Sequence, residues 1–415
     1  MRQTSIRTAL TAVYTAGGVS ALGSQMTMLA LPWLVLETTG SATRAGAVFA
    51  VQVLPLALLG FVGAEVVQRL GARNTMIAGD LARAPIVALV PVLHALGTLS
   101  LPALLAIVAA QGICGVPYFA SQRVVAAELV GTDTGALTRA NSVLEGIFNA
   151  TSFAGPALAG TLIAVIGSAP VIWLDATSFA ISGLLLLLFV PRVSARGASP
   201  TRGPRGVWAG LHRLRQDAFL RQVVPSTVAY GFLMRVLAIA LPLLAFDRFA
   251  GDARLGGLLV AGSGAGALVG SLLTYLVATR VGTERLMALA VVLLALPLWA
   301  LVLPAPVVVL AGAAAVTSAA VPLTNAPYFT ILTARVPVEY RPRVLQSVIT
   351  LSNIAGPLGF LAAGVLTDSV GITTTMMLVA ALATLATVNI LLAMRHLTER
   401  SVSATVPAPA TGAAE

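Results

Sequence analysis

The chain has 415 residues, of which 58% are hydrophobic and only 10% are charged, whereas a soluble globular protein carries about 25% charged residues. Its formal net charge is +10, and every one of its basic residues other than histidine is an arginine. The composition excludes an ordinary soluble domain. The absence of lysine from the sequence excludes a self-contained P-loop ATPase and lysine Schiff-base chemistry.

Long apolar segments follow one another along the chain and are separated by short polar turns. A bilayer core about 30 Å thick requires about 20 apolar residues in a helix, and backbone polar groups in lipid must bond within their own segment. We therefore predict an all-α membrane protein with twelve transmembrane helices near residues 10–36, 44–67, 75–96, 103–127, 137–166, 170–190, 221–246, 255–279, 286–303, 306–333, 345–367 and 371–394.

The arginines are concentrated on one side of these predicted helices. With both termini in the cytoplasm, 21 of the 25 arginines fall in cytoplasmic loops or at cytoplasmic helix ends, and Arg235 alone lies inside a helix. This bias predicts a multi-pass protein of a bacterial inner (plasma) membrane with both termini cytoplasmic. A basic chain can also indicate nucleic-acid binding, but these basic loops have no interleaved aromatic residues, so we expect no nucleic-acid partner.

The longest and most basic loop divides the chain into two sets of six helices. We predict an N-terminal bundle at 1–190, a cytoplasmic linker at 191–220, a C-terminal bundle at 221–400 and a disordered tail at 401–415. Pro-Tyr-Phe occurs at 117–119 and again at 327–329, and Ala-Gly-Pro occurs at 154–156 and again at 355–357. Two matches in the same order favour a duplication that gives two pseudo-symmetric bundles, with a substrate site between them near mid-membrane.

Two further segments resemble a known family. Residues 68–73 read Gln-Arg-Leu-Gly-Ala-Arg and are similar to the Asp-Arg-x-Gly-Arg-Arg loop of the major facilitator superfamily, and residues 79–83 continue the likeness as Gly-Asp-Leu-Ala-Arg. The run Gly-Pro-Ala-Leu-Ala-Gly at 155–160 resembles the antiporter motif of the drug:proton antiporter branch, which includes macrolide-efflux proteins and the enterobactin exporter. The resemblance covers nearly the whole chain and implies transport by alternating access.

In that family the loop controls the inward-open and outward-open states by charge pairing across the halves. This chain departs from the pattern because Gln68 replaces the aspartate and Ala72 replaces the first of the paired basic residues. The remaining candidates for the gate are Glu65, Arg69, Arg73 and Arg83. In the antiporter-like motif, Gly155, Pro156 and Gly160 predict a helix that bends and packs closely against a neighbour.

Charged residues near the bilayer centre are expensive and indicate function. Glu145 and Arg235 are expected at that depth, from opposite halves, and we expect Glu145 to carry the coupling proton while Arg235 tunes its pKa or meets an anionic substrate. A static ion pair is the alternative interpretation. Asp175 and Asp80 are further candidates for proton coupling. Glu37 and Asp368 are expected at external helix ends, in solvent.

By analogy with the family, four helices supply the substrate cavity. Polar or aromatic candidates to line it, besides Arg235, are Tyr14, Gln25, Gln111, Tyr118, Tyr230, Asn325 and Tyr328. A mostly apolar pocket with few hydrogen-bonding groups suits bulky amphipathic molecules.

Other chemistry lacks the residues that it requires. The three histidines lie far apart in sequence and Cys114 is the only cysteine, so we expect no metal site, no disulfide and no cofactor. The glycines at 262, 266 and 270 predict close helix packing rather than a dinucleotide loop. No set of residues for covalent catalysis is apparent, so an enzyme is not expected.

The sequence therefore predicts a proton-coupled exporter of hydrophobic or amphipathic small molecules that acts as a monomer in the bilayer. A narrow-specificity exporter of a siderophore or secondary metabolite is one alternative. A non-transporting membrane sensor is another, and the altered gating loop at Gln68 and Ala72 is the feature in its favour.

Overall fold

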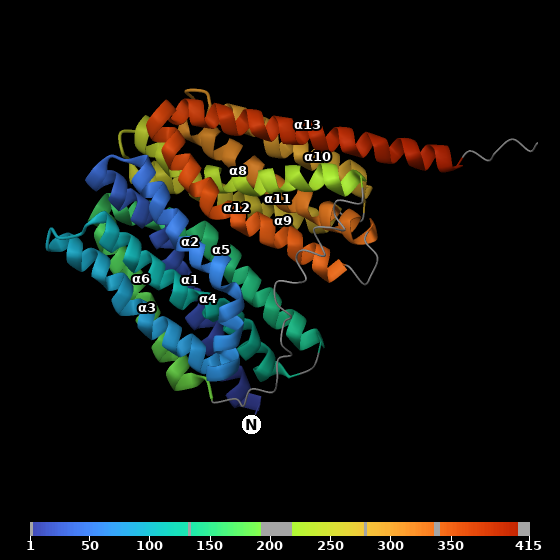
Figure 1. The fold of residues 1–415 in the computed structure, drawn as a ribbon. Helices are drawn as coiled ribbons and strands as arrows, with labels where there is room; N and C mark the ends of the chain where they lie inside the picture. The colour runs from blue at the N-terminus through green and yellow to red at the C-terminus, as the bar shows by residue number, and fades with distance from the viewer. Residues whose placement is uncertain (1–2, 132–133, 192–217, 278–279, 336–340, 406–415) are drawn as a thin grey trace, which may run out of the picture.

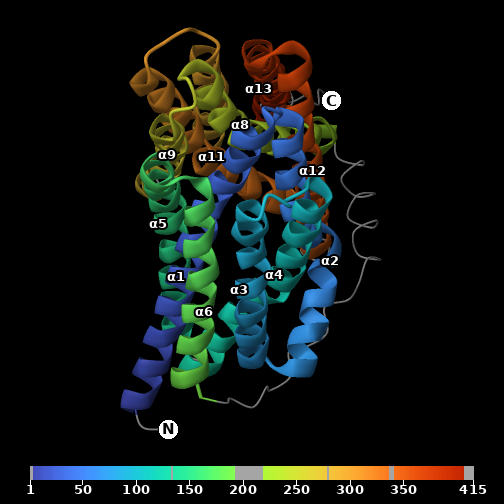
Figure 2. The same cartoon turned by 90° about the vertical axis from the view of Figure 1, so that its left-hand side faces the viewer.

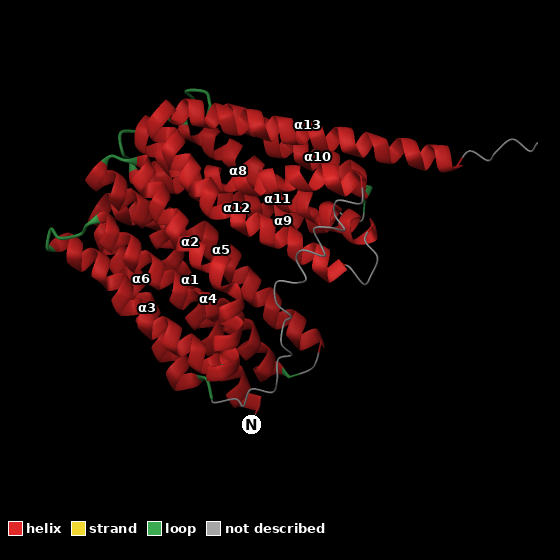
Figure 3. Cartoon of the chain, in the orientation of Figure 1, coloured by secondary structure: helices red, strands yellow, loops and turns green. Residues whose placement is uncertain are grey.

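The computed structural model describes residues 3–131, 134–191, 218–277, 280–335 and 341–405, which form helices and no β-strand (Figure 3). The first half contains α1 (Gln3–Thr39), α2 (Ala42–Leu70), α3 (Ala72–Ala95), α4 (Leu101–Val130), α5 (Thr134–Ile166) and α6 (Ser168–Phe189). The second half contains α8 (Ala218–Arg248), α9 (Ala253–Val277), α10 (Thr283–Ala295), the 3₁₀ helix η1 (Leu296–Leu301), α11 (Val307–Arg335), α12 (Arg341–Val370) and α13 (Ile372–Thr405).

The twelve predicted spans are confirmed. Each coincides with one helix, except that the ninth is made by α10 together with η1, where Pro297 lies at the start of the 3₁₀ turn. Ten of the described helices are long and apolar enough to cross a bilayer, and α2 and α12 are longer than the roughly 20 residues that a span needs. The largest difference lies at the C-terminal end, where α13 continues to Thr405, into the segment predicted to be a disordered tail.

Short turns join the helices because single glycines adopt a left-handed backbone that other residues avoid. Gly167 between α5 and α6 has φ of +87°, and Gly371 between α12 and α13 has φ of +82°. These two glycines occupy corresponding places in the two halves, as a duplication predicts.

Large apolar side chains remain exposed on the outer faces of several helices, notably α6, α9 and α13. Leu188, Leu272 and Leu385 are 64%, 60% and 65% exposed, respectively. A soluble protein rarely leaves so much contiguous apolar surface in water, so these faces are suited to contact lipid chains.

The two halves form separate bundles that converge at one end and diverge toward the other (Figure 1). We call the end that carries Gln3, Phe189 and Ala218 the linker side, and the opposite end the far side. The bundles meet through α2 against α12 and α5 against α9, and the perpendicular view shows the same two pairs side by side (Figure 2). These contacts concentrate toward the far side.

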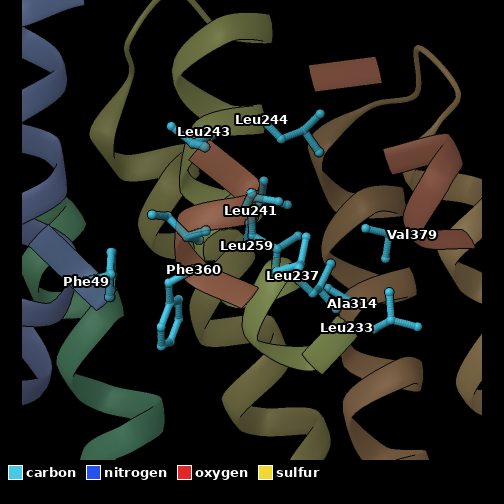
Figure 4. Close-up of a cluster of buried hydrophobic side chains, with 14 of the residues drawn as sticks. Phe49, Leu233, Leu237, Leu241, Leu243, Leu244, Leu259, Ala314, Phe360 and Val379 are labelled. Atoms are coloured by element: carbon cyan, nitrogen blue, oxygen red, sulfur yellow. The ribbon is translucent and has the colours of Figure 1, made fainter. Parts of the chain in front are cut away.

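The largest apolar cluster crosses the boundary between the halves near the far side. Trp33 on α1 is 1% exposed and its ring lies edge-on to Phe246 of α8, with centroids 5.4 Å apart. Phe49 of α2 stacks on Phe360 of α12 at 5.2 Å, beside the leucines of α8 (Figure 4). Burial of aromatic and leucine side chains supplies most of the attraction between the halves at this end.

Candidate functional site

A central cavity of about 380 Å³ lies between the two halves. Helices α1, α2 and α5 of the first half and α8, α9 and α11 of the second half contribute its walls. Among the described residues that line it no side chain is charged, and the polar ones are amides and hydroxyls: Gln25, Ser152, Ser263, Ser271, Ser318 and Asn325. The remaining wall is apolar, with Met28, Phe49 and Leu241 among its members.

Gln25 on α1 is fixed at the edge of this cavity by a hydrogen bond. Its amide Nε2 donates to the Ser152 hydroxyl on α5 at 2.8 Å, and that hydroxyl donates to the Phe148 carbonyl at 2.8 Å. The contact depends on Gly155, because a methyl group there would lie 2.5 Å from the Gln25 Cβ atom. The first glycine of the antiporter-like motif therefore allows α1 and α5 to approach at the cavity wall.

The rest of that motif lies at the boundary between the halves. A methyl group at Gly160 of α5 would lie 2.8 Å from the Gly257 Cα atom of α9 and 2.5 Å from the Ala253 carbonyl oxygen. Pro156 lines the central cavity. The predicted close packing is confirmed, and its partners are α1 within the half and α9 across the boundary.

A second cavity of about 460 Å³ lies within the first half, among α1, α3, α4 and α5. It is more polar than the central cavity and is lined by Ser20, Ser24, Gln25, Arg83, Tyr118, Gln122, Arg123 and Glu145, among others. Gln25 lines both cavities. The amide of this one side chain therefore lies where the two spaces adjoin.

A buried charged network lies next to the second cavity. Asp80 and Arg83, one turn apart on α3, form an ion pair in which the side chains are 0% and 6% exposed. The Ser182 hydroxyl of α6 donates to the other Asp80 carboxylate oxygen at 2.5 Å. The Arg83 guanidinium carbon lies 4.6 Å from the Tyr118 ring centre and 4.2 Å from that of Phe179. An ion pair at this depth is stable because hydrogen bonds and two aromatic faces replace its water.

Asp175 on α6 is another buried carboxylate of the first half, and it forms no ion pair with a described residue. Its side chain is completely buried, the Ser178 hydroxyl lies 3.4 Å from Oδ1, and Oδ2 has no hydrogen-bond partner among the described residues. The α1 backbone lies close, since a methyl group at Gly23 would come within 2.7 Å of Oδ1. An ionised carboxylate with an unsatisfied oxygen is expensive to bury, so this group is suited to exchange a proton.

Glu145 and Arg235, predicted to act together, do not pair in this structure. Glu145 pairs with Arg123 of α4 at 3.2 Å, and both side chains are more than half exposed at the second cavity. Arg235 packs against α12, where a methyl group at Gly359 would lie 3.0 Å from its Cβ atom. Arg235 forms no ion pair with a described residue and is not among the described residues that line the central cavity.

The other predicted cavity residues are distributed over both halves. Gln25 and Asn325 line the central cavity, and Tyr118 lines the second. Tyr230 instead bonds within the second half, where its hydroxyl donates to the Ala383 carbonyl at 3.0 Å and contacts Thr387. Tyr14, Gln111 and Tyr328 lie in helix-packing positions away from the central cavity: Tyr14 is half-buried, and the other two are buried.

The candidate gating residues form contacts within the first half. Glu65 pairs with Arg69 on the next turn of α2 at 2.5 Å, and both are well exposed. Arg73 of α3 donates to the carbonyls of Leu187, at 2.9 Å, and Val190 at the end of α6. Arg83 belongs to the buried network rather than to a surface loop. The Gln68 side chain lies outside the described residues.

Sequence reasoning missed part of the cavity wall. Ser152, Ser263 and Ser271 read as ordinary small residues of packed helices, and Ser263 lies within the stretch interpreted as packing alone. Gly262, Gly266 and Gly270 do face α11, so that interpretation is confirmed for the glycines. The i, i+8 spacing of Ser263 and Ser271 places both on one face of α9, which was the signal available.

The arrangement of two six-helix bundles around a central cavity defines a membrane transporter of the major facilitator fold. Among solved structures, a point-mutant form of the nucleoside transporter NupG superposes with a TM-score of 0.78 at 13% identity, covering 93% of this chain and 99% of that one. A bacterial homologue of the lysosomal transporter Spinster gives 0.73 at 13% identity, covering 96% and 99%. Identities this low support the fold alone.

Sequence comparison identifies the family. Residues 4–411 match the family of transmembrane secretion effectors, and the chain belongs to this family of the major facilitator superfamily. The chain is also 31% identical over 374 residues to the multidrug efflux pump Tap of Mycolicibacterium fortuitum, covering 88% of this chain and 89% of that protein.

Proposed function

We propose that this protein exports hydrophobic or amphipathic small molecules across the bacterial inner membrane by alternating access, coupled to proton entry. The central cavity is the observation that carries the proposal. It lies between the halves, its wall is mostly apolar, and its polar groups are neutral amides and hydroxyls. Such a wall accepts molecules of varied shape through apolar contact and a few hydrogen bonds. The relative named a multidrug efflux pump supports the same substrate class.

The orientation follows from the arginines. With the linker side in the cytoplasm, the basic loops face inward. The structure, whose halves converge at the far side (Figure 1), then corresponds to a state open toward the cytoplasm, from which an exporter loads its substrate. The chain acts as a monomer in this proposal, since both cavities are formed within one chain.

The broad-specificity proposal is preferred to a siderophore exporter. An acidic ligand would favour a cation in the cavity wall, but none of the described residues that line the central cavity is charged. Arg235, the cation predicted for that role, is an exposed residue whose Cβ atom lies against α12, and it is not among the described residues that line the central cavity.

Proton coupling is assigned to the buried carboxylates of the first half. Asp175 is the primary proton site in this proposal, because it is buried, forms no ion pair with a described residue and has a carboxylate oxygen without a hydrogen bond among them. Asp80 is held by Arg83 and Ser182 and has a supporting role. Glu145 is already paired with Arg123 in an exposed position, so its substitution is expected to have the smaller effect.

Gln25 connects substrate binding with proton release. It lines the central cavity and the second cavity, and its bond to Ser152 ties α1 to α5. A substrate that competes for the Gln25 amide would alter the α1 backbone on which Gly23 contacts Asp175. Substrate binding and proton release are thereby linked through one helix.

The test uses inside-out membrane vesicles that contain the protein, a fluorescent lipophilic dye and an imposed proton gradient. The wild type is expected to accumulate dye only with the gradient, whereas Asp175→Asn retains dye binding but loses at least about tenfold of the gradient-driven rate, the consequence of removing the titrating group. Asp252→Asn, at an exposed turn, is the matched control.

The outcomes separate the parts of the proposal. Gradient-driven uptake that survives in Asp175→Asn contradicts the assignment of the proton site and moves it to Asp80. Failure of the wild type to move or bind lipophilic dyes and macrolides contradicts the substrate class. Dye binding without transport under any gradient would favour the membrane-sensor alternative.

A further inference from the structure

The end of α12 and the beginning of α2 meet at the far side, although they belong to different halves. A methyl group at Gly46 of α2 would lie 2.7 Å from the Phe360 carbonyl oxygen, and one at Gly364 of α12 would lie 2.5 Å from the Ala42 carbonyl oxygen. The two backbones are therefore as close as glycine permits. This proximity places the last turn of α12 beside the first turn of α2.

Asp368 in that last turn accepts hydrogen bonds from the first turn of α2. Its Oδ1 accepts from the Ala42 backbone N–H at 2.9 Å, and its Oδ2 accepts from the Thr43 N–H at 2.8 Å and from the Ser41 hydroxyl at 2.9 Å. The first N–H groups of a helix have no partner inside the helix, and the dipole there favours an anion. Asp368 thus caps a helix of the other half.

The local sequence of α2 leaves these donors available. Ser41 is the residue before the helix, and its hydroxyl oxygen accepts from the Arg44 N–H at 3.3 Å. Ser41 therefore caps one donor of its own helix, while Asp368 takes the two others that precede it. The expectation that Asp368 is only solvated is incomplete, because its exposed carboxylate also joins the halves.

The other pair of helices that crosses the boundary is built differently. The α9 N-terminus is capped from within its own half, since Asp252 accepts from the Arg254 N–H at 2.8 Å. At the end of α12, an acid lies three residues before the turn glycine Gly371. The corresponding end of α5, which packs on α9, has the turn glycine Gly167 but no acid at that position. Among the described residues, only the contact between α2 and α12 has a carboxylate bonded to backbone across the halves.

We propose that Asp368 is a latch that holds the far side closed and that must release α2 before this side opens. Its three hydrogen bonds exist only while α2 and α12 touch, so they stabilise the state closed at the far side and are absent from the state open there. An ordinary cap within one half, such as Asp252, stabilises both states equally and does not shift the equilibrium between them. Asp368 is therefore a positioning residue for alternating access.

The charges around the latch come from the neighbouring helix ends. Arg44 on α2 is exposed, and Glu37 on α1 accepts from the Ser168 hydroxyl at 2.6 Å. On α8, Asp247 precedes Arg248, and Arg248 donates to the carbonyls of Leu303 and Val302 and to the Thr373 hydroxyl of α13. Glu37 and Arg248 thus bond to other groups, whereas Asp368 bonds to the groups of α2.

The test measures the distance between the halves at the far side. Spin labels are placed at the exposed loop positions Thr98→Cys and Pro304→Cys in a Cys114→Ser background, which is free of other cysteines. Pulsed electron–electron double resonance in lipid nanodiscs measures the distance between the two labels and so gives the populations of the closed and open states. This measurement needs no substrate, so it can fail or succeed independently of the proposed export function, on whose alternating access the latch rests.

Asp368→Asn keeps one accepting oxygen, but its amide nitrogen cannot accept the bonds made by the other carboxylate oxygen. It is expected to raise the ratio of open to closed by about fivefold, the effect of losing about 1 kcal/mol of hydrogen bonding. Asp368→Glu retains the charge and is expected to fall between Asp368→Asn and the wild type. The control Asp252→Ala loses a helix cap within one half and is expected to leave the ratio unchanged.

Unchanged populations in Asp368→Asn would overturn the proposal. An equal shift in Asp252→Ala would also overturn it, because general destabilisation and not a latch would then explain the result. Thermal unfolding of each variant checks folding. If Asp368→Asn is poorly folded, Asp368→Ser takes its place with the same expected shift.

Discussion

The two halves share a fold but bury different chemistry at corresponding positions. Asp175 lies eight residues after the turn glycine Gly167, and Val379 lies eight residues after Gly371. Ser182 and Ala386 are likewise both fifteen residues beyond those glycines. All four side chains are buried. A carboxylate and a hydroxyl in the first half are thus replaced by two apolar side chains in the second.

The third helices of the halves differ in the same way. Asp80 and Arg83 lie nine and twelve residues after Gly71, the residue that precedes α3, while Val291 and Leu294 lie nine and twelve residues after Gly282, the residue that precedes α10. The interior polar contacts of Tyr230 and Asn389 in the second half are neutral. Among the described residues, the buried ion pair lies in the first half, where we place proton handling, and the corresponding positions of the second half are apolar.

The largest expected effect comes from breaking the buried ion pair of the first half. Arg83→Met leaves Asp80 buried without a countercharge and should destabilise the fold by about 3–5 kcal/mol. Leu294→Met, at the corresponding position of the second half, is a similar-volume apolar exchange that should cost less than about 1.5 kcal/mol. The folded yield and the thermal unfolding midpoint in detergent distinguish the two. Similar losses of stability in both variants would show that the buried ion pair contributes no more to stability than the apolar packing at the corresponding position.

The next effect concerns the packing that replaces charge in the second half. A methyl group at Gly266 of α9 would collide with the backbone carbonyl of Ala315 on α11, and one at Gly270 with that of Ala319. Because backbone cannot rotate away, Gly266→Ala should cost about 1–3 kcal/mol through displaced helices. The same substitution at Gly312 of α11, which has open space around it, should be neutral or slightly stabilising.

Thermal unfolding of these two alanine variants measures the contrast. A loss at Gly312 equal to that at Gly266 would contradict the assignment of the effect to the contact between α9 and α11, because alanine is the better helix former and has open space at Gly312.

A smaller effect is expected from the neutral hydrogen bonds of the second half. Tyr230→Phe removes the hydroxyl that donates to the Ala383 carbonyl and contacts Thr387, and a neutral hydrogen bond is worth about 1 kcal/mol. Tyr275→Phe is the control, because that tyrosine is 80% exposed. A shift of the unfolding midpoint in Tyr230→Phe as large as that in Arg83→Met would contradict the distinction drawn between the halves.

The fold could be predicted from sequence because lipid imposes few choices. Apolar length, arginine bias and the repeated Pro-Tyr-Phe and Ala-Gly-Pro segments together fix twelve helices in two bundles. The sequence also selected Asp80, Asp175 and Gln25, since polar groups within apolar segments are conspicuous.

The partners of these residues could not be predicted. Glu145 and Arg235 were matched by depth alone, but depth does not fix the direction in which each side chain leaves its helix. In the structure Glu145 meets Arg123, and Arg235 meets α12. Asp368 was missed for a related reason, because its partners are backbone groups of α2, which no side-chain pattern reveals.

The smallest expected effect is the pH dependence of the latch, which differs in kind from that of a proton-coupling site. Partial burial alone would raise the pKa of Asp368, but hydrogen bonds from Thr43, Ser41 and Ala42 outweigh it and hold this pKa below its ordinary value of 3.8. A lowered pKa means that the ionised carboxylate stabilises the latched state above the ordinary pKa, and that this contribution is lost as the pH falls through the lowered value.

The latch should therefore act unchanged between about pH 8 and about pH 5 and weaken only in stronger acid. In the spin-label experiment, the difference between the wild type and Asp368→Asn should stay constant over that range. Gradient-driven transport, by contrast, should change over it if a buried carboxylate of the first half exchanges protons during the cycle. A latch difference that disappears near pH 6 would contradict the lowered pKa and would place a titrating step at the far side, outside the half to which we assign proton handling.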